Sequence, residues 1–144
     1  MSSDAVPRLA FGLVAAPGAK VASAFEELAG WMRTHGGGDP EPHLAATYQE
    51  LAMSVREGTS DVAWLPPVVH AWLAEAVTPL GSIARAGKTT YSAALVVRND
   101  AKIHSLEELA GARAAWVDPW SAAGYVVPRL ELARAGIDPT SLFA

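Results

Sequence analysis

The segment Asp118–Gly124 has the composition of an anion-binding turn. It follows an apolar run and precedes a helical stretch, so it joins the end of a predicted strand to the start of a predicted helix. Backbone N–H groups and the positive end of the helix dipole attract anions at such a junction. Ser121 adds a hydroxyl donor, and the small residues Ala122, Ala123 and Gly124 let an oxyanion approach the backbone. An ordinary helix cap is the alternative interpretation.

Aromatic residues also fall at the expected ends of strands. The capping box that Thr47 opens, with Glu50 as its third helical residue, predicts a helix start. Tyr48 would then project its phenol from the mouth of the sheet, or alternatively pack in the core. Trp64 and Trp120 flank expected loops, where an indole can stack on a ligand or simply pack against the fold.

The sequence lacks the motifs of the common enzyme classes. It contains no Gly-x-Ser-x-Gly elbow, no phosphate-binding glycine loop followed by Lys and Ser or Thr, and no Gly-x-Gly-x-x-Gly. Cysteine is absent, and none of the 4 histidines stands four residues from another as in a helical metal site. We therefore expect a protein that is not an enzyme and that uses no cofactor and no metal.

Composition narrows the classes of partner. The net charge is −4 and the basic residues are scattered singly, which argues against nucleic acid because phosphate contacts need a concentrated cationic face. No apolar run is long enough to cross a membrane. The apolar run Leu9–Ala16 is short and leads into an acidic amphipathic stretch, so we expect a first strand rather than a signal peptide. The chain as written would then be cytoplasmic.

Short apolar runs alternate with helical stretches, and this order predicts an α/β fold with a mostly parallel sheet and helices on both faces. A Pro17-Gly18 turn follows the first run, and Pro128 predicts a kink or a broken start in the last helix. The predicted strands are Arg8–Val14, Leu44–Thr47, Asp61–Leu65, Leu80–Ala84, Tyr91–Arg98 and Ala112–Val117. The predicted helices are Ala19–Thr34, a helix from Thr47 to about Glu57, Val68–Ala76, a short one at Ser105–Glu108, and Ser121–Ala135.

Ordered motifs along nearly the whole chain resemble a known family. They are Tyr48-Gln49-Glu50-Leu51, Gly58 to Leu65, Tyr91 to Arg98, Ser105 to Gly111, Asp118 to Pro128 and Gly136-Ile137-Asp138-Pro139. This series is similar to the phosphate-, phosphite- and phosphonate-binding proteins of ABC importers, in the type II periplasmic binding protein superfamily. The resemblance implies two α/β lobes that bind a small oxyanion between them. We assign the first lobe to residues 1–90, and the crossover strand with an incomplete second lobe to residues 91–144.

The resemblance also implies functions for single residues. Tyr48 and Tyr91 match tyrosines that reach the ligand, and Ser121 matches the first residue of a Ser-Thr-Ser-Gly phosphate-binding run. The sequence departs from that run at Ala122 and Ala123, which removes two hydroxyl donors. The ligand-binding residues expected from this match and from the preceding patterns are Tyr48, Trp64, Tyr91, Ser121, Ala122, Ala123 and Gly124.

Family members run to about twice this length, so an incomplete second lobe would leave strand edges exposed. Exchange between two chains in a homodimer, or a truncated product, are the two interpretations. The resemblance implies an ABC permease as partner and a small anion as ligand. One alternative is a cytoplasmic ligand-sensing or orphan binding module with altered ligand choice, which includes the case of a fragment. The other alternative is an enzyme on the same scaffold.

Overall fold

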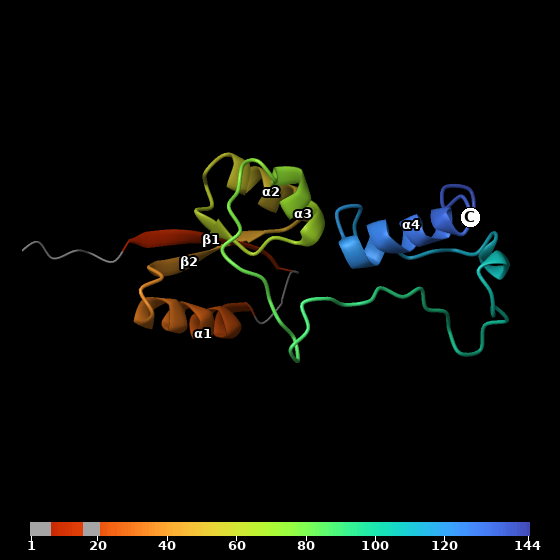
Figure 1. Cartoon of the computed structure of the whole chain (residues 1–144), viewed down its shortest axis with the longest axis horizontal. Coiled ribbons are helices and arrows are strands. Elements are labelled where there is room, and N and C mark those ends of the chain that lie inside the picture. Colours follow the sequence, from red (N-terminus) through yellow and green to blue (C-terminus); the bar gives the residue numbers. More distant parts are fainter. Residues whose placement is uncertain (1–6, 16–20) are drawn as a thin grey trace, which may run out of the picture. The chain divides into compact units, whose positions relative to one another are not determined.

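The computed structural model describes residues 7–15 and 21–144 of the chain. The chain divides into two compact units, Met1–Thr78 and Pro79–Ala144 (Figure 1). The turn expected at Pro17-Gly18 lies outside the described residues. The lobe boundary that the sequence suggests after residue 90 stays a prediction.

The first unit contains a three-stranded parallel sheet in the order β2-β1-β3. Strand β1 (Arg8–Val14) lies between β2 (Asp39–Ala45) and the short β3 (Val62–Ala63). Its register with β2 runs from Arg8↔Asp39 to Val14↔Ala45, and its register with β3 is Phe11↔Val62 and Gly12↔Ala63.

Helices cover both faces of this sheet, as the α/β prediction requires. Helix α1 (Val21–Thr34) lies on one face, and α2 (Tyr48–Arg56) and α3 (Pro67–Leu73) lie on the other (Figure 1). Each helix follows a strand, and right-handed strand–helix–strand connections of this kind generate parallel pairing. Helix α3 starts at Pro67, one residue before the predicted Val68, and ends at Leu73, before the expected Ala76.

The α1 face of the sheet holds an aromatic core. Phe11 from β1 and Phe25 from α1 meet edge to face with ring centroids 5.7 Å apart, and Ala29 is fully buried beside them. Leu13, Val21, Leu28, Met32 and Val62 pack around this cluster. The helical spacing of Val21, Phe25, Leu28 and Met32 therefore marks the buried side of α1.

The opposite face brings α2 against the middle of β1. Leu51 is 0% exposed, and a Cβ added to Gly12 would lie 2.9 Å from its Cδ1 and 2.8 Å from Ser60 Oγ. Ser60 Oγ contacts Ser54 Oγ at 3.0 Å, so the buried hydroxyls satisfy one another. Only glycine lets the helix and the serine pair approach the strand this closely.

Strand β2 starts earlier than the sequence suggested. The predicted strand Leu44–Thr47 is wrong in its bounds, because pairing with β1 begins at Asp39 and ends at Ala45. Pro40 and Pro42 lower the strand propensity of this segment, so a prediction based on propensity misses the start of the strand. They are tolerated because β2 is an edge strand, where alternate residues need no partner for an N–H.

The second unit contains helical elements and no strand among described residues 79–144. These elements are a 3₁₀ turn at Glu107–Leu109, a π-helical turn at Ala122–Val126 and α4 (Val127–Arg134). Pro128 lies in the first turn of α4, which confirms the predicted broken start of the last helix. A small core of Leu109, Leu132 and Leu142 holds this unit together.

The strands predicted at Leu80–Ala84, Tyr91–Arg98 and Ala112–Val117 are wrong for this structure. Their described residues are irregular, and most side chains in the first two segments are exposed. A β-rich sequence forms a strand only where a neighbouring strand takes up its backbone hydrogen bonds. The described residues of the second unit supply no such neighbouring strand. The β-rich sequence pattern alone was therefore not enough to predict strands there.

Candidate functional site

An apolar hollow of about 330 Å³ opens in the first unit between β1, α1 and the end of β3. Two of the residues expected at the site, Tyr48 and Trp64, line it together. The full lining is Phe11, Leu13, Val14, Val21, Ala24, Phe25, Leu28, Tyr48, Trp64 and Pro66. The structure thus brings two sequence-predicted residues to one place, at the carboxyl end of the strands.

Tyr48 is positioned by the predicted capping box. The Glu50 N–H donates to Thr47 Oγ1 at 3.1 Å, and the Glu50 carboxylate accepts from the Ala46 N–H at 2.8 Å. This fixes the start of α2, whose first residue is Tyr48. The ring is half-buried, and its hydroxyl has no hydrogen-bond partner among the described residues. The phenol can therefore donate to a ligand.

Trp64 is held through its backbone rather than its side chain. Its N–H donates to the Gly12 carbonyl at 2.9 Å, which continues the β1–β3 ladder by one residue. The side chain is 50% exposed at the rim of the hollow. An indole in this position can stack on a ligand or be covered by another protein surface.

The hollow suits an apolar group better than a bare oxyanion. Its lining side chains offer only the Tyr48 hydroxyl and the Trp64 indole N–H as donors, and none of them is charged. The apolar lining residues were missed as site residues. The helical spacing of the lining residues in α1 predicts that they are buried, but it does not predict that they line a cavity.

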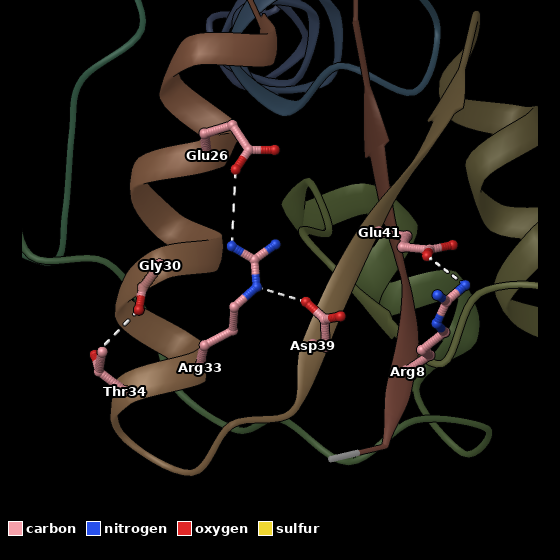
Figure 2. Close-up of polar contacts among 7 residues, drawn as sticks. All are labelled: Arg8, Glu26, Gly30, Arg33, Thr34, Asp39 and Glu41. Carbon is pink, nitrogen blue, oxygen red and sulfur yellow. Dashed lines mark hydrogen bonds and ion pairs between the residues drawn. The ribbon is translucent and has the colours of Figure 1, made fainter. Parts of the chain in front are cut away.

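The described arginines of the first unit are already engaged. Arg33 Nε contacts Asp39 Oδ1 at 2.5 Å and its Nη1 lies 3.7 Å from Glu26 (Figure 2), and the Asp39 hydrogen bond raises the pKa of Arg33. Arg8 pairs with Glu41 at 3.0 Å (Figure 2). Arg56 lies over the Trp72 ring. An anion meeting this part of the unit would be recognised by neutral donors.

Ser121 is the N-cap of the π-helical turn in the second unit. Its Oγ accepts from the Gly124 N–H at 3.1 Å, and its own N–H donates to the Asp118 carbonyl at 2.8 Å. The Asp118 carboxylate in turn accepts from the Trp120 N–H at 2.7 Å. Because the serine oxygen acts here as an acceptor, its hydroxyl proton is left to donate to an anion.

Ala122, Ala123 and Gly124 form the turn that Ser121 caps. The Val126 N–H donates to the Ser121 carbonyl at 3.0 Å, which gives the wide π-type ring. A Cβ on Gly124 would clash with the Val117 side chain, so glycine is required for this close approach. All three residues are half-buried, in keeping with a cradle of small side chains.

Tyr91 lies in an irregular, exposed part of the second unit. Its side chain is 67% exposed, and its hydroxyl has no partner among the described residues. The sequence-predicted residues thus form three groups: Tyr48 with Trp64 in the hollow, Ser121 with the turn that follows it, and Tyr91 alone.

A cationic aromatic cluster in the second unit was missed. The Arg129 guanidinium lies 4.9 Å from the Tyr125 ring centroid and 5.8 Å from that of Trp116, and it donates to the Pro139 carbonyl at 3.0 Å. The spacing of Tyr125 and Arg129, four residues apart on a helix, was the available signal. The cluster ties α4 to the C-terminal turn.

Metal and membrane sites are not seen in the part of the chain that the structure describes. No group of three or more His, Asp or Glu side chains there could hold a metal ion. Within the same residues, no helix has both the length and the hydropathy to cross a bilayer.

Comparison with known proteins gives one family. The family described as periplasmic substrate-binding proteins of phosphonate ABC transporters matches residues 11–144. A binding protein component of an ABC phosphonate transporter from Pseudomonas aeruginosa has a similar structure, with a TM-score of 0.77 and 22% identity over 96% of this chain. A Xanthomonas citri protein bound to a chloride ion has a TM-score of 0.61 and 26% identity over 90% of this chain.

The chain spans about half the length of these solved structures, 49% in both cases. The likeness to the Pseudomonas protein supports the fold, and the Xanthomonas protein binds an anion. No curated protein matches the chain.

Proposed function

Because the chain belongs to the family of periplasmic substrate-binding proteins of phosphonate ABC transporters, we propose that it binds a small oxyanion such as phosphate or a phosphonate. The match over residues 11–144 is the observation that carries this proposal. The function is binding for import through an ABC permease, and no catalytic step is involved.

The hydroxyl groups support this function. Ser121 donates its proton to the anion, because its oxygen already accepts from the Gly124 N–H. Tyr48 in the first unit and Tyr91 in the second each have a phenol proton without a partner among the described residues, so each unit by itself offers a neutral donor for an anion. An oxyanion offers acceptors only, so such donors are what it needs.

Ala122 and Ala123 limit the affinity. In the Ser-Thr-Ser-Gly run of the resembling family these positions carry hydroxyls, and each lost donor to an anion costs about 1.5–3 kcal/mol where nothing replaces it. The amide groups at the start of the turn remain available. We expect binding that is weaker than a complete hydroxyl run would give.

A second candidate is an orphan or ligand-sensing module with altered ligand choice. The observation that favours it is the apolar hollow of the first unit, beside Tyr48 and Trp64. Such a site would accept an oxyanion that carries an alkyl or aryl group.

We also propose that the chain is a homodimer. Tyr91, Val96 and Val117 are 67%, 86% and 72% exposed, which leaves apolar surface in the second unit that a further chain can cover. Light scattering on the full chain tests this, and a cooperative monomer at micromolar concentration would contradict it.

Isothermal titration of the full chain with phosphate, methylphosphonate and sulfate tests the ligand. We expect binding of at least one anion, and a loss of about 10- to 100-fold in Ser121→Ala, since a hydrogen bond to a charged group is worth about 1.5–3 kcal/mol. Restoring hydroxyls with Ala122→Thr and Ala123→Ser should raise affinity. Tyr125→Phe is the matched control, because this tyrosine packs against Trp116 and Arg129. Absence of binding in every variant would overturn the proposal.

A further inference from the structure

Arg129 connects three separate segments of the second unit. Its guanidinium carbon lies 4.9 Å from the centroid of the Tyr125 ring and 5.8 Å from that of the Trp116 ring. Its Nη1 donates to the Pro139 carbonyl at 3.0 Å. A planar guanidinium can stack on an aromatic ring and donate hydrogen bonds in its own plane at the same time. Arg129 therefore fixes the two rings relative to the C-terminal turn.

The same two rings hold the π-helical turn in place. Tyr125 is a residue of that turn, and its ring meets Trp116 edge to face with centroids 5.6 Å apart. The residues next to these rings are joined through the backbone, because the Val117 N–H donates to the Gly124 carbonyl at 3.3 Å. The turn is thus attached by one backbone hydrogen bond and one ring contact, and Arg129 lies against both rings of that contact.

The first amides of the turn are unbonded. The N–H groups of Ala122, Ala123 and Tyr125 donate to no other group among the described residues. The backbone of the turn sets the direction of these donors, so any contact that holds the turn also holds the amides. Donors that are already oriented bind an anion more tightly, because binding then does not have to order them.

We propose that Arg129 is a positioning residue for anion binding, which acts through the Tyr125 ring to hold the turn amides in the orientation that binds an oxyanion. This inference rests on the proposed function and adds to it a residue beyond the Asp118–Pro128 motif. The guanidinium is engaged with two rings and a carbonyl, so its effect reaches the anion through the turn. Helix α4 supplies a fixed base for Arg129, because Leu132, three residues further along, is 1% exposed in the core of the second unit.

A pair of arginine variants on the same helix separates positioning from charge. Arg129→Gln removes the guanidinium from the Tyr125 ring, whereas Arg134→Gln removes the same charge from an exposed side chain that pairs with Glu131. Isothermal titration of the folded full chain with phosphate and with methylphosphonate should show about fivefold weaker binding for Arg129→Gln. Arg134→Gln should bind as the wild type does. Equal losses in the two variants would overturn the inference, because net charge would then explain the effect.

A double-mutant cycle tests the route through the ring. Tyr125→Leu removes the ring, so we expect Arg129→Gln to weaken phosphate binding no further in that background. Losses that simply add would show that Arg129 acts without Tyr125, which would overturn the proposed route. Leu132→Ala controls for stability, because it weakens the leucine core and should leave the affinity of the folded protein unchanged.

Hydrogen exchange in the absence of anion gives a measurement that does not depend on binding. The Val126 and Val127 N–H groups donate to carbonyls one π-helical turn back, so their exchange reports whether the turn is closed. We expect about fivefold faster exchange of both amides in Arg129→Gln than in Arg134→Gln. Equal exchange in the two variants would overturn the inference. A wild-type protein that binds neither anion would overturn the proposed function instead, and the exchange rates would still decide whether Arg129 holds the turn.

Discussion

The two units of the chain bury their apolar side chains by different means. In the first unit a parallel sheet separates α1 from α2, and Ala29 and Leu51 on its two faces are both 0% exposed. In the second unit a few leucines around α4 form the core, while Val96 stays 86% exposed. Helices form from local hydrogen bonds, whereas strands depend on neighbours. The sheet is therefore what gives the first unit its layered core.

The largest expected effect on stability comes from truncating a buried side chain in each of the two cores. Leu51→Ala removes a fully buried side chain between α2 and the sheet, and should destabilise the first unit by about 3–5 kcal/mol. Leu132→Ala, in the smaller cluster of the second unit, should cost about 2–3 kcal/mol because its surroundings can collapse more easily. Urea denaturation measures both, with the 85% exposed Leu80 mutated to alanine as the neutral control. Equal losses in the free energy of unfolding for Leu51→Ala and Leu132→Ala would contradict the contrast between the units.

Glycine substitutions give an intermediate effect. Gly12→Ala forces a Cβ against Leu51 and Ser60 at less than 3 Å, which should cost about 1–3 kcal/mol. Gly124→Ala brings its Cβ to 2.7 Å from Val117 Cβ and 3.0 Å from Ser121 Oγ. Val117 is 72% exposed in an irregular segment that can shift more easily than a sheet strand, so the loss should be smaller. Gly30, inside α1 with nothing within 4 Å of its added Cβ, should instead gain about 0.5–1 kcal/mol on mutation to alanine. Thermal unfolding of the three variants checks this order.

The smallest expected effect is on how the stability of the second unit depends on pH. Hydrogen bonds from Thr140, and a further one from Ser141, lower the pKa of Asp138. A carboxyl whose pKa is lowered by folding stabilises the fold above its unfolded pKa of about 3.9, and this is lost as pH falls through the folded value. Asp138→Ala should reduce stability at neutral pH. The difference from wild type should vanish in strong acid, as followed by near-ultraviolet circular dichroism.

Much of the first unit followed from sequence patterns. The spacing of apolar residues in α1 and the capping box at Thr47 are local signals, and both elements formed where they were expected. The start of β2 was missed because Pro40 and Pro42 lower strand propensity. Their tolerance depends on which edge of the sheet β2 occupies, which is a tertiary fact.

The candidate site residues also differ in how far the local sequence predicts them. The Ser121 cap and the glycine after it are encoded within a few residues, so the sequence was sufficient to find them. The hollow at Tyr48 and Trp64 depends on how α1 packs on β1, which no short motif specifies. The strand pattern of Tyr91–Arg98 misled because pairing requires a neighbour that local sequence does not reveal.

Hydrogen exchange on the full chain, with and without methylphosphonate, tests the account most directly. We expect slow exchange for the β1 amides facing β2 and β3 and fast exchange across residues 91–98, because only the former amides lie in a ladder. Added phosphonate should slow exchange at residues 121–127, where we propose that Ser121 and the turn amides bind the anion. Protection of residues 91–98 equal to that of β1, together with no change at residues 121–127, would contradict both the contrast between the units and the proposed binding.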